Sequence, residues 1–391
     1  MITMNKQLTS VFKIFELNLA FHFSDSLDKL FVYPTNVYLS LTNRCTLNCK
    51  MCDIVKLPRT KKELTTKEIK KILDEVKTWN GDQIILLTGG EPFIRKDVFD
   101  IINYSVSLGL RTEVVSNGTL IDEKTAEKIM DSGLTMIAIS LDSSKPKIHD
   151  DMRGVNGAFN GAVRAIKNLV KAKVKKGYGP LLEVWTTITN LNLEELYNIT
   201  PFTKKLGVEC LVYHPVIIGQ AQMQEATNEG PLWIPKSRIP LMEKNIKKIE
   251  KFSKSHPNFV AWLHDTSLFS KYFRKELGKS EWKCNPYMFV CITMNGQLQI
   301  CGESFGDIRK KSITELLNSD DAFKLREKMK KCDKNCLQSC WARPEADNLS
   351  NICNDFLKSV SSFPKSERKM MIKKGLGLLN KYEKIVEKSK V

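Results

Sequence analysis

The chain has 391 residues, 42% of them hydrophobic and 27% charged, which is the composition of a globular protein. It shows no run of eighteen apolar residues and no signal peptide with a cleavage site, so we expect a cytoplasmic protein. The net charge of +17 permits an anionic partner, but the lysines are spread along several helical stretches, as on an ordinary solvated surface. Eleven cysteines in such a chain indicate oxygen-labile metal, and an anaerobic setting, more than disulfides.

Residues 1–35 carry regularly spaced apolar side chains among few charges, including Phe12, Phe15 and Phe23. This pattern predicts an amphipathic helix that packs on the next domain, its commoner fate, or lies on a membrane surface. The segment is too short to be a domain of its own.

Residues 36–215 alternate short apolar runs with amphipathic stretches, which is the signal for repeated β-α units. Six such units make an α/β fold, an incomplete parallel barrel whose functional residues gather at the carboxyl ends of its strands. The six expected strands are Val37 to Leu41, Gln83 to Leu87, Arg111 to Val115, Thr135 to Leu141, Leu182 to Thr187 and Glu209 to Tyr213.

Three cysteines, Cys45, Cys49 and Cys52, follow the first of these runs within eight residues. Three thiolates can hold one face of an iron-sulfur cube and leave one iron free to bind something else. A structural zinc knuckle is the alternative, but it needs a fourth ligand, and no His or Cys lies between Cys52 and His149.

This C-x3-C-x2-C loop resembles that of the radical S-adenosylmethionine (SAM) superfamily. The resemblance implies a TIM-like partial (β/α)6 barrel, with Cys45, Cys49 and Cys52 as the catalytic metal ligands of a [4Fe-4S] cluster. SAM would bind the open iron, and an electron from flavodoxin or ferredoxin would cleave it to a 5′-deoxyadenosyl radical that takes a substrate hydrogen. Most members have an aromatic residue before the third cysteine, where this chain has Met51.

A glycine-rich run, Gly89, Gly90, Glu91 and Pro92, follows the second expected strand. The two glycines let the backbone approach a ligand closely, and Glu91 can accept a hydrogen bond from an ammonium group. The run could be an ordinary turn; by resemblance it holds the amino group of SAM.

Short polar side chains follow the third and fourth expected strands, at Ser116, Asn117, Ser140 and Asp142. They are common turn residues, and by resemblance they contact the SAM ribose or carboxylate. Arg153 closes a His-Asp-Asp-Met-Arg-Gly run that resembles one found in members with extra clusters. Its guanidinium could clamp the SAM carboxylate, or it could form a salt bridge at the start of a helix.

The fifth and sixth expected strands end near Thr187, Asn190, Val212 and His214. By resemblance, Thr187, Asn190 and Val212 contact SAM or substrate. His214 could serve as an acid or base because histidine titrates near neutrality, or it could be a hydrogen-bonded structural residue.

Residues 216–280 read as a linker and a helix, in the region where members of the superfamily build their substrate-specific walls. Residues 281–356 then hold a second field of cysteines, within which Val290 to Ile300 predicts a β-hairpin turning at Asn295-Gly296. The cysteines of this field are Cys284, Cys291, Cys301, Cys332, Cys336, Cys340 and Cys353.

The second field resembles the SPASM/twitch module, which holds auxiliary iron-sulfur clusters. By order, Cys284, Cys291, Cys301 and Cys340 would close one cluster. The module's full pattern is one cysteine short here, so a second cluster would have only Cys332, Cys336 and Cys353, or be absent. The alternative is a structural zinc on some of these residues. Auxiliary clusters suit a net oxidation, such as dehydrogenation or bond formation, because the substrate radical must lose an electron.

The tail, residues 357–391, predicts a basic amphipathic helix that docks on the barrel or, with the first segment, on anionic lipid, which would put the protein at the inner membrane face. Three substrate classes compete: a peptide, a small polar molecule and a lipid. We expect no large leader-binding domain at the amino end, which counts against a peptide unless another chain recognises it. The rival from another class is a non-catalytic iron-sulfur electron carrier; nucleic-acid binding lacks the expected interleaving of basic and aromatic residues.

Overall fold

The computed structural model describes residues 2–27, 30–57, 62–79, 83–217, 230–262, 265–278, 286–337 and 349–389. Within them one sheet of ten strands runs in the order β10-β9-β8-β1-β2-β3-β4-β5-β6-β7. The strands are β1 Asn36–Ser40, β2 Ile84–Thr88, β3 Arg111–Ser116, β4 Met136–Ser140, β5 Leu181–Ile188, β6 Cys210–Pro215, β7 Val260–Trp262, β8 Phe289–Ile292, β9 Gln297–Ile300 and β10 Glu303–Asp307.

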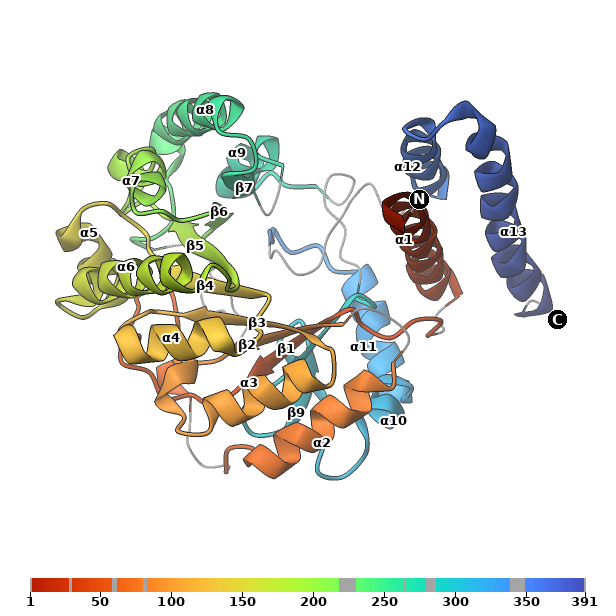
Figure 1. The fold of residues 1–391 in the computed structure, drawn as a ribbon, viewed down its shortest axis with the longest axis horizontal. Coiled ribbons are helices and arrows are strands. Elements are labelled where there is room, and N and C mark those ends of the chain that lie inside the picture. The colour runs from red at the N-terminus through yellow and green to blue at the C-terminus, as the bar shows by residue number, and fades with distance from the viewer. Residues whose placement is uncertain are drawn as a thin grey trace.

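The helices lie outside the curved sheet (Figure 1). They are α1 Ile2–Leu27, α2 Thr66–Lys77, α3 Val98–Ser107, α4 Glu123–Asp131, α5 Pro146–Arg153, α6 Ala158–Lys176, α7 Ile199–Lys205, α8 Ile239–Ser255, α9 Ser267–Arg274, α10 Ile313–Leu317, α11 Asp320–Lys330, α12 Leu349–Ser361 and α13 Lys365–Ser389.

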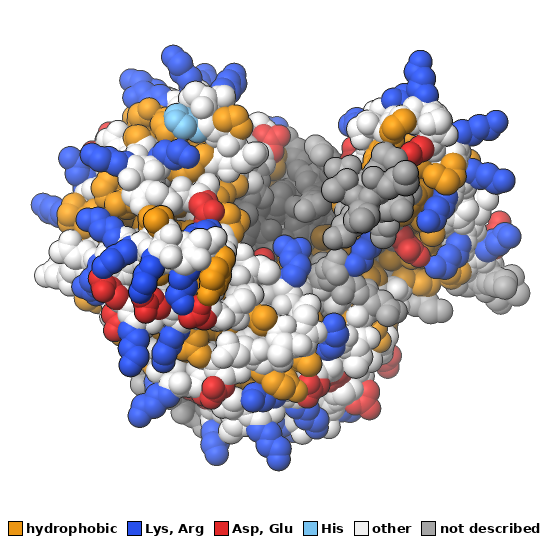
Figure 2. All heavy atoms as spheres, in the orientation of Figure 1, with side chains coloured by type: hydrophobic (Ala, Val, Ile, Leu, Met, Phe, Trp, Pro, Cys, Tyr) orange, Lys and Arg blue, Asp and Glu red, His pale blue; other side chains and the backbone are white. Residues whose placement is uncertain are grey.

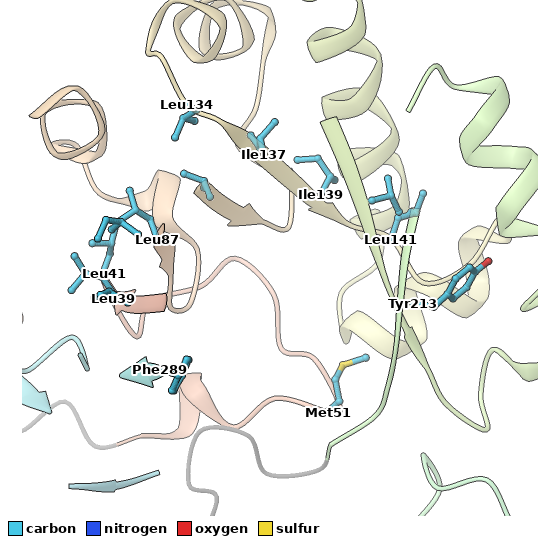
Figure 3. Packing of buried hydrophobic residues seen from close by; sticks show 14 of the residues in the cluster. Leu39, Leu41, Met51, Leu87, Leu134, Ile137, Ile139, Leu141, Tyr213 and Phe289 are labelled. Carbon is cyan, nitrogen blue, oxygen red and sulfur yellow. The ribbon is translucent and has the colours of Figure 1, made fainter. Parts of the chain in front are cut away.

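Strands β1 to β6 are parallel and neighbour one another in chain order, with helices between them. This confirms the predicted α/β fold with a partial barrel. Local sequence supports it: α2 begins at a capping box in which Thr65 and Glu68 satisfy each other's backbone N–H groups. The helix-facing side chains of the strands form the main apolar core, which also includes Met51 from the cysteine loop (Figure 3).

The sheet extends beyond the six units at both edges. Strand β7 pairs with β6, and β8 pairs in parallel with β1, joining Val290 to Val37. The predicted hairpin is present as β8 and β9, with Gly296 at φ +83° in its turn. The segment after it is attached to α2: the Glu75 carboxylate accepts from the first N–H groups of α10, and the Arg309 side chain donates to Glu68. The carboxyl-terminal cysteine region therefore continues the barrel sheet.

The two ends of the chain form a separate group of three helices, α1, α12 and α13, beside the barrel (Figure 1). We call this group the helical lobe. Phe15 stacks on Phe356 at 4.2 Å, and Phe23 stacks on Tyr382 at 5.3 Å. The sequence predicted that the first helix lies on the barrel or on a membrane surface. In the structure its apolar face packs mainly against α12 and α13, because the three helices carry apolar stripes that bury one another.

Lysine and arginine side chains are scattered over the barrel helices and over the helical lobe on the face drawn in Figure 2. Many are paired with acids, such as Lys175 with Glu127 on neighbouring helices. This is the solvated surface that the spread of lysines predicted. None of the described helices is long and apolar enough to cross a membrane.

Candidate active site

The three predicted cluster cysteines stand on the loop that leaves β1, at its carboxyl end. All three side chains are partly buried. Burial raises the pKa of the Cys45 and Cys52 thiols, and the neighbouring thiols raise it further. The Arg153 guanidinium is a positive charge beside this set, and it offsets only part of the rise at Cys52. Three close, partly buried thiols fit a metal cluster, because bound iron would supply further positive charge to the thiolates.

No group of three or more His, Cys, Asp or Glu side chains in the described segments is placed to hold a metal ion. A single zinc draws each sulfur to about 2.3 Å from one point. The zinc alternative for this loop therefore gains no support.

The end of α5 fastens the cysteine loop through the backbone. Asn48 N–H donates to the Arg153 carbonyl at 3.1 Å, and Lys50 N–H donates to the Met152 carbonyl at 2.9 Å. Gly154 ends the helix at φ +70°, and a Cβ there would lie 2.1 Å from the Asn48 carbonyl oxygen. Only glycine lets the two segments approach this closely.

The predicted glycine run packs against the same loop from the other side. Gly90 N–H donates to the Thr42 carbonyl and Glu91 N–H to the Arg44 carbonyl. A Cβ on Gly89 would lie 2.5 Å from the Thr42 oxygen, and one on Gly90 would lie 2.1 Å from the Arg44 oxygen. In this structure the glycines bring β2 close to the segment just before Cys45, and that approach is what requires them.

Glu91 is fully buried, and its carboxylate accepts from neighbouring protein groups. It receives hydrogen bonds from the Ser116 hydroxyl at 2.9 Å, the Asn117 N–H at 2.8 Å and the Phe93 N–H at 3.2 Å. Burial raises its pKa to about 7, although these three donors favour the charged form. The side chain thus ties the end of β2 to the end of β3.

Asn117 links that strand end to the first cysteine. Its amide nitrogen lies 3.5 Å from the Cys45 sulfur and 3.1 Å from the Thr46 hydroxyl. Its amide oxygen accepts from the N–H and the hydroxyl of Thr119. The structure therefore brings Ser116 and Asn117 together with Glu91 and the cysteine loop.

A buried ion pair lies on the opposite side of the loop. The Arg153 Nε donates to Asp142 at 2.6 Å, and its Nη1 lies 3.9 Å from the Cys49 sulfur. Burial opposes ionisation of Asp142, yet the Arg153 guanidinium lowers the carboxyl pKa, and Thr187 N–H adds a hydrogen bond at 3.0 Å. His149 accepts from the Asp142 N–H, and burial lowers its pKa to about 4, so its ring is neutral.

The remaining predicted contacts divide into two groups. Thr187 and His214 face each other across β5 and β6, with the Thr187 hydroxyl 3.4 Å from the His214 Nε2, near Asp142. Asn190 is turned elsewhere: its N–H donates to the Leu232 carbonyl, and its side-chain oxygen accepts from Arg238. It fastens the strand end to the segment that follows β6.

Ser140 and Val212 flank Trp185 as its strand neighbours on β4 and β6. Side chains on this face of the strands point away from the helices, and many stay partly exposed, whereas those on the other face are buried. Full barrels fill their interior with packed side chains. In this partial barrel several side chains of the inner face are partly exposed.

Three residues of the barrel interior, Trp185, Glu183 and Glu113, were not among the site residues predicted from the sequence. The Trp185 indole N–H donates to Glu183 at 2.7 Å, and burial raises the pKa of both Glu183 and Glu113. Their signal was available: a carboxylate or an indole at every second position of an apolar run faces the side opposite the helices.

The second cysteine field is less compact. Cys291 lies on β8, where burial raises its pKa to about 12. Cys301 stands in the tight turn between β9 and β10, where burial and the neighbouring Cys332 raise its pKa. Cys336 lies beside Tyr272 of α9. Cys353 is on α12 and packs in the helical lobe. The predictions for Cys284 and Cys340 lie outside the described residues.

Comparisons with known proteins agree with this geometry. Residues 39–198 match the family model described as Radical SAM superfamily. The chain is 35% identical over 184 residues to the AdoMet-dependent heme synthase of Methanosarcina barkeri, covering 46% of this chain and 50% of that protein. It is 30% identical over 182 residues to the PqqA peptide cyclase of Bradyrhizobium diazoefficiens, covering 46% of each. The chain thus spans about half the length of these relatives.

Solved structures share the fold at low identity. Streptococcus suis SuiB bound to S-adenosylmethionine superposes with a TM-score of 0.60 at 15% identity, covering 78% of this chain and 70% of that one. The structure of anSMEcpe with bound AdoMet gives 0.59 at 14% identity, covering 88% and 100%. The family match includes the cysteine loop and the strand ends around it, so residues 39–198 of this chain are similar to the radical SAM superfamily.

Proposed function

We propose that this chain is an enzyme that binds SAM and a [4Fe-4S] cluster at the carboxyl ends of β1 to β6 and removes a hydrogen atom from a substrate. The observation that carries the proposal is the loop of Cys45, Cys49 and Cys52, clamped by backbone hydrogen bonds on two sides. When bound, such a cluster supplies the electron that cleaves SAM to a 5′-deoxyadenosyl radical.

The chain's own residues orient the reactants. Asp142 fixes the Arg153 guanidinium beside Cys49. There the remaining N–H groups of Arg153 can donate hydrogen bonds to the SAM carboxylate. Glu91 holds the ends of β2 and β3 together, so the Gly89-Gly90 backbone stays at a fixed position beside the cysteine loop. Asn117 donates toward Cys45 and favours the thiolate form needed by a ligand.

We infer that the substrate occupies the barrel interior, below the SAM site. Trp185 supplies an apolar wall there, and Glu183 and Glu113 supply acceptors for hydrogen-bond donors of the substrate. His214 lies between this interior and Asp142, so it is the candidate to receive a proton when the substrate is oxidised.

A net oxidation also needs a route for the second electron. We propose an auxiliary iron-sulfur cluster on cysteines of the second field, among them Cys291, Cys301 and Cys332. These residues lie on or next to the strands that extend the sheet at β1, whose loop carries Cys45. A flavodoxin or ferredoxin is the proposed external donor.

The names of the matched relatives suggest candidate classes of substrate. One is named a heme synthase and another a PqqA peptide cyclase, so a porphyrin-like molecule and a peptide are both candidates, with a lipid as the third. The test is turnover with each class under identical conditions. Only a substrate that increases 5′-deoxyadenosine and is itself recovered with loss of hydrogen qualifies.

The first experiment measures iron, sulfide and SAM cleavage in the anaerobically reconstituted protein and in the Cys45→Ala/Cys49→Ala/Cys52→Ala variant. With dithionite and SAM, we expect 5′-deoxyadenosine from the wild type alone, and about four fewer irons per chain in the variant. Cys210→Ala is the matched control, because Cys210 is a partly buried barrel cysteine outside the loop. SAM cleavage by the triple variant would refute the proposal and favour the electron-carrier alternative.

Membrane association is a lesser proposal, motivated by α13. Met370, Ile372 and Leu376 are exposed on this helix, beside Lys369 and Lys373. An anionic lipid surface would receive both kinds of side chain. Flotation with phosphatidylserine vesicles at low salt tests it, and a Met370→Ser/Leu376→Ser variant should bind several-fold less. Equal flotation of the two proteins, or flotation of neither, would refute membrane association through α13.

A further inference from the structure

Residues 62–65, just before α2, form a short segment that contacts both cysteine regions. On one side the segment lies against residues 42–44, which lead directly into Cys45. On the other side Leu64 N–H donates to the carbonyl of Met294, in the turn between β8 and β9, at 2.7 Å. One segment therefore joins the start of the cysteine loop to the hairpin of the second cysteine field.

The Glu63 carboxylate gathers the three residues that precede Cys45. Its Oε1 accepts from the Thr42 hydroxyl at 2.5 Å and from the Asn43 N–H at 3.3 Å. Its Oε2 lies 3.6 Å from the Arg44 guanidinium. The Thr42 hydroxyl oxygen accepts in turn from the Arg44 N–H at 3.1 Å. The carboxylate thus fixes the backbone as far as the residue next to the first cysteine.

Glu63 holds different groups of the chain from those held by the glycine run and by α5. The glycine run holds the carbonyl groups of Thr42 and Arg44. Glu63 holds the Asn43 N–H and the side chains on either side of it. Helix α5 holds the loop further along, at Asn48. Loss of the Glu63 carboxylate should therefore loosen the first cysteine more than the second and third.

Arg309, which follows β10, holds the segment in place from the side of the hairpin. Its Nη2 donates to the carbonyls of Lys62 and Glu63 at 3.1 and 3.4 Å, and its Nη1 donates to the Asn295 carbonyl at 2.8 Å. Its Nε donates to Glu68 at 2.6 Å, and this hydrogen bond lowers the pKa of that carboxyl to about 2. One guanidinium thus ties the hairpin turn to the segment and to α2.

We propose that Glu63 is a positioning residue for Cys45 and that the hairpin of the second cysteine field holds Glu63 in place through Arg309. The inference rests on the proposed [4Fe-4S] site. A cluster needs its three thiolates in position together, and a loop that is ordered before iron arrives binds it more tightly. Glu63 acts on Cys45 through residues 42–44 and is not itself a ligand. The second cysteine field thus supports the first site whether or not it holds a cluster of its own.

The test measures how fast each cysteine of the metal-free, full-length protein reacts with iodoacetamide, site by site, by mass spectrometry. Each rate is compared with that of the same cysteine in the wild type. The variants are Glu63→Ala, Glu63→Gln and Arg309→Met. Glu75→Ala is the matched control, because the Glu75 carboxylate also joins α2 to the carboxyl-terminal region, but through the first N–H groups of α10.

Glu63→Ala should raise the alkylation rate of Cys45 about tenfold, because two hydrogen bonds and an ion pair that hold the preceding residues are lost. Cys49 and Cys52 should change by less than about threefold, since the bonds from α5 still order their part of the loop. Arg309→Met should raise the Cys45 rate about threefold, because the segment is freed but keeps its carboxylate.

Two variants should leave the alkylation rate of Cys45 near that of the wild type. Glu63→Gln keeps a side-chain oxygen that can accept from Thr42 and Asn43. Glu75→Ala breaks a link that does not involve the cysteine loop. A faster reaction of Cys45 in Glu75→Ala would mean that any weakening of α2 loosens the loop, and it would overturn the special role of Glu63.

The pattern over the cysteines separates positioning from general stability. An equal rise at Cys45, Cys210 and Cys353 in Glu63→Ala would show that the substitution only favours unfolding, and it overturns the proposal, as does an unchanged Cys45. If Glu63→Ala does not fold, Arg309→Met decides. A wild-type Cys45 rate in Arg309→Met overturns the link to the hairpin.

The reconstituted protein gives a second measurement. With SAM and dithionite, Glu63→Ala should form 5′-deoxyadenosine about tenfold more slowly than the wild type, while Glu75→Ala keeps the wild-type rate. Wild-type SAM cleavage by Glu63→Ala would overturn the positioning role. A wild type that binds no iron at the cysteine loop refutes the proposed function instead, and the alkylation pattern of the metal-free protein then still decides the role of Glu63.

Discussion

The two cysteine regions are built in opposite ways. Cys45, Cys49 and Cys52 stand on one loop, and backbone hydrogen bonds from α5 and from the glycine run hold that loop on two sides. In the second region, Cys291 lies on a strand, Cys301 in a turn and Cys353 on a helix of another lobe. The first site is specified by local spacing, and the second depends on how distant elements pack.

This difference teaches where each site is vulnerable. The first should fail when the backbone contact of the loop is disturbed, even with every cysteine present. The second should tolerate changes at cysteines that packing has placed apart. The four predictions below test that contrast, beginning with the largest effect.

Gly154→Ala should abolish assembly of the first cluster. The new Cβ would lie 2.1 Å from the Asn48 carbonyl oxygen, so the loop must move. Gly157→Ala is the matched control, since Gly157 also has positive φ, +87°, but nothing within 4 Å of its Cβ. The control should cost about 1–2 kcal/mol of stability and keep its iron. Equal iron in both variants would show that the close contact between Gly154 and Asn48 is not needed for cluster assembly.

Arg153→Met should cost about 3–5 kcal/mol of unfolding free energy, because it leaves the buried Asp142 carboxylate without its cation. The measurement is urea unfolding in the triple-alanine protein, where no first cluster contributes. Asp142→Asn/Arg153→Met should recover a large part of the loss. A double variant that is as unstable as the sum of the two single variants would argue against a coupled pair.

The burial of Glu91 leads us to expect that the stability of the protein falls as the pH rises. Its pKa is raised by burial to about 7, so the folded state holds a proton that the unfolded chain releases near its ordinary value of 4.5. Stability from this group is full below pH 4.5 and is lost as pH rises to 7, by about 3 kcal/mol. Glu91→Gln in the triple-alanine protein should flatten that slope, measured by urea unfolding between pH 5 and 8. An unchanged slope would assign the titration to another group.

Cys353→Ser should have the smallest effect, about 1 kcal/mol of stability with auxiliary iron unchanged, because Cys353 packs in the helical lobe. Cys301→Ser, by contrast, should lose auxiliary iron. Both are measured in the triple-alanine protein. Iron loss from Cys353→Ser would return this cysteine to the ligand set and weaken the contrast between the two regions.

The barrel was predictable because its signals are local. The run Thr135 to Leu141 contains β4, which is shorter by one residue at each end. The cysteines, the glycine run and Asp142 each follow a strand, and Arg153 ends the helix after β4. Helix α5 was seen only as a motif, because its eight residues carry too short an apolar pattern. The edge strands β7 and β8 could not be placed, since their pairing partners are distant in sequence.

Side-chain roles were harder to foresee for the same reason. Glu91 was expected to face a ligand, but its hydrogen-bond donors Ser116 and Asn117 come from the next strand. Asn190 was expected to contact SAM or substrate, but its partners Leu232 and Arg238 come from the segment after β6. In both cases the deciding neighbour lies outside the residue's own element.

The pairing of β1 with β8 has a consequence for synthesis of the chain. Asn36 bonds to Met288, which is 252 residues later. At about 5–20 residues per second, the ribosome needs roughly 13–50 s to deliver the partner of β1. During that time one edge of the first strand, next to the oxygen-sensitive cysteine loop, has no partner and can pair with other chains. Slow production at low temperature, or a chaperone that covers this edge, should therefore raise the yield of active protein more than changes to its surface charge.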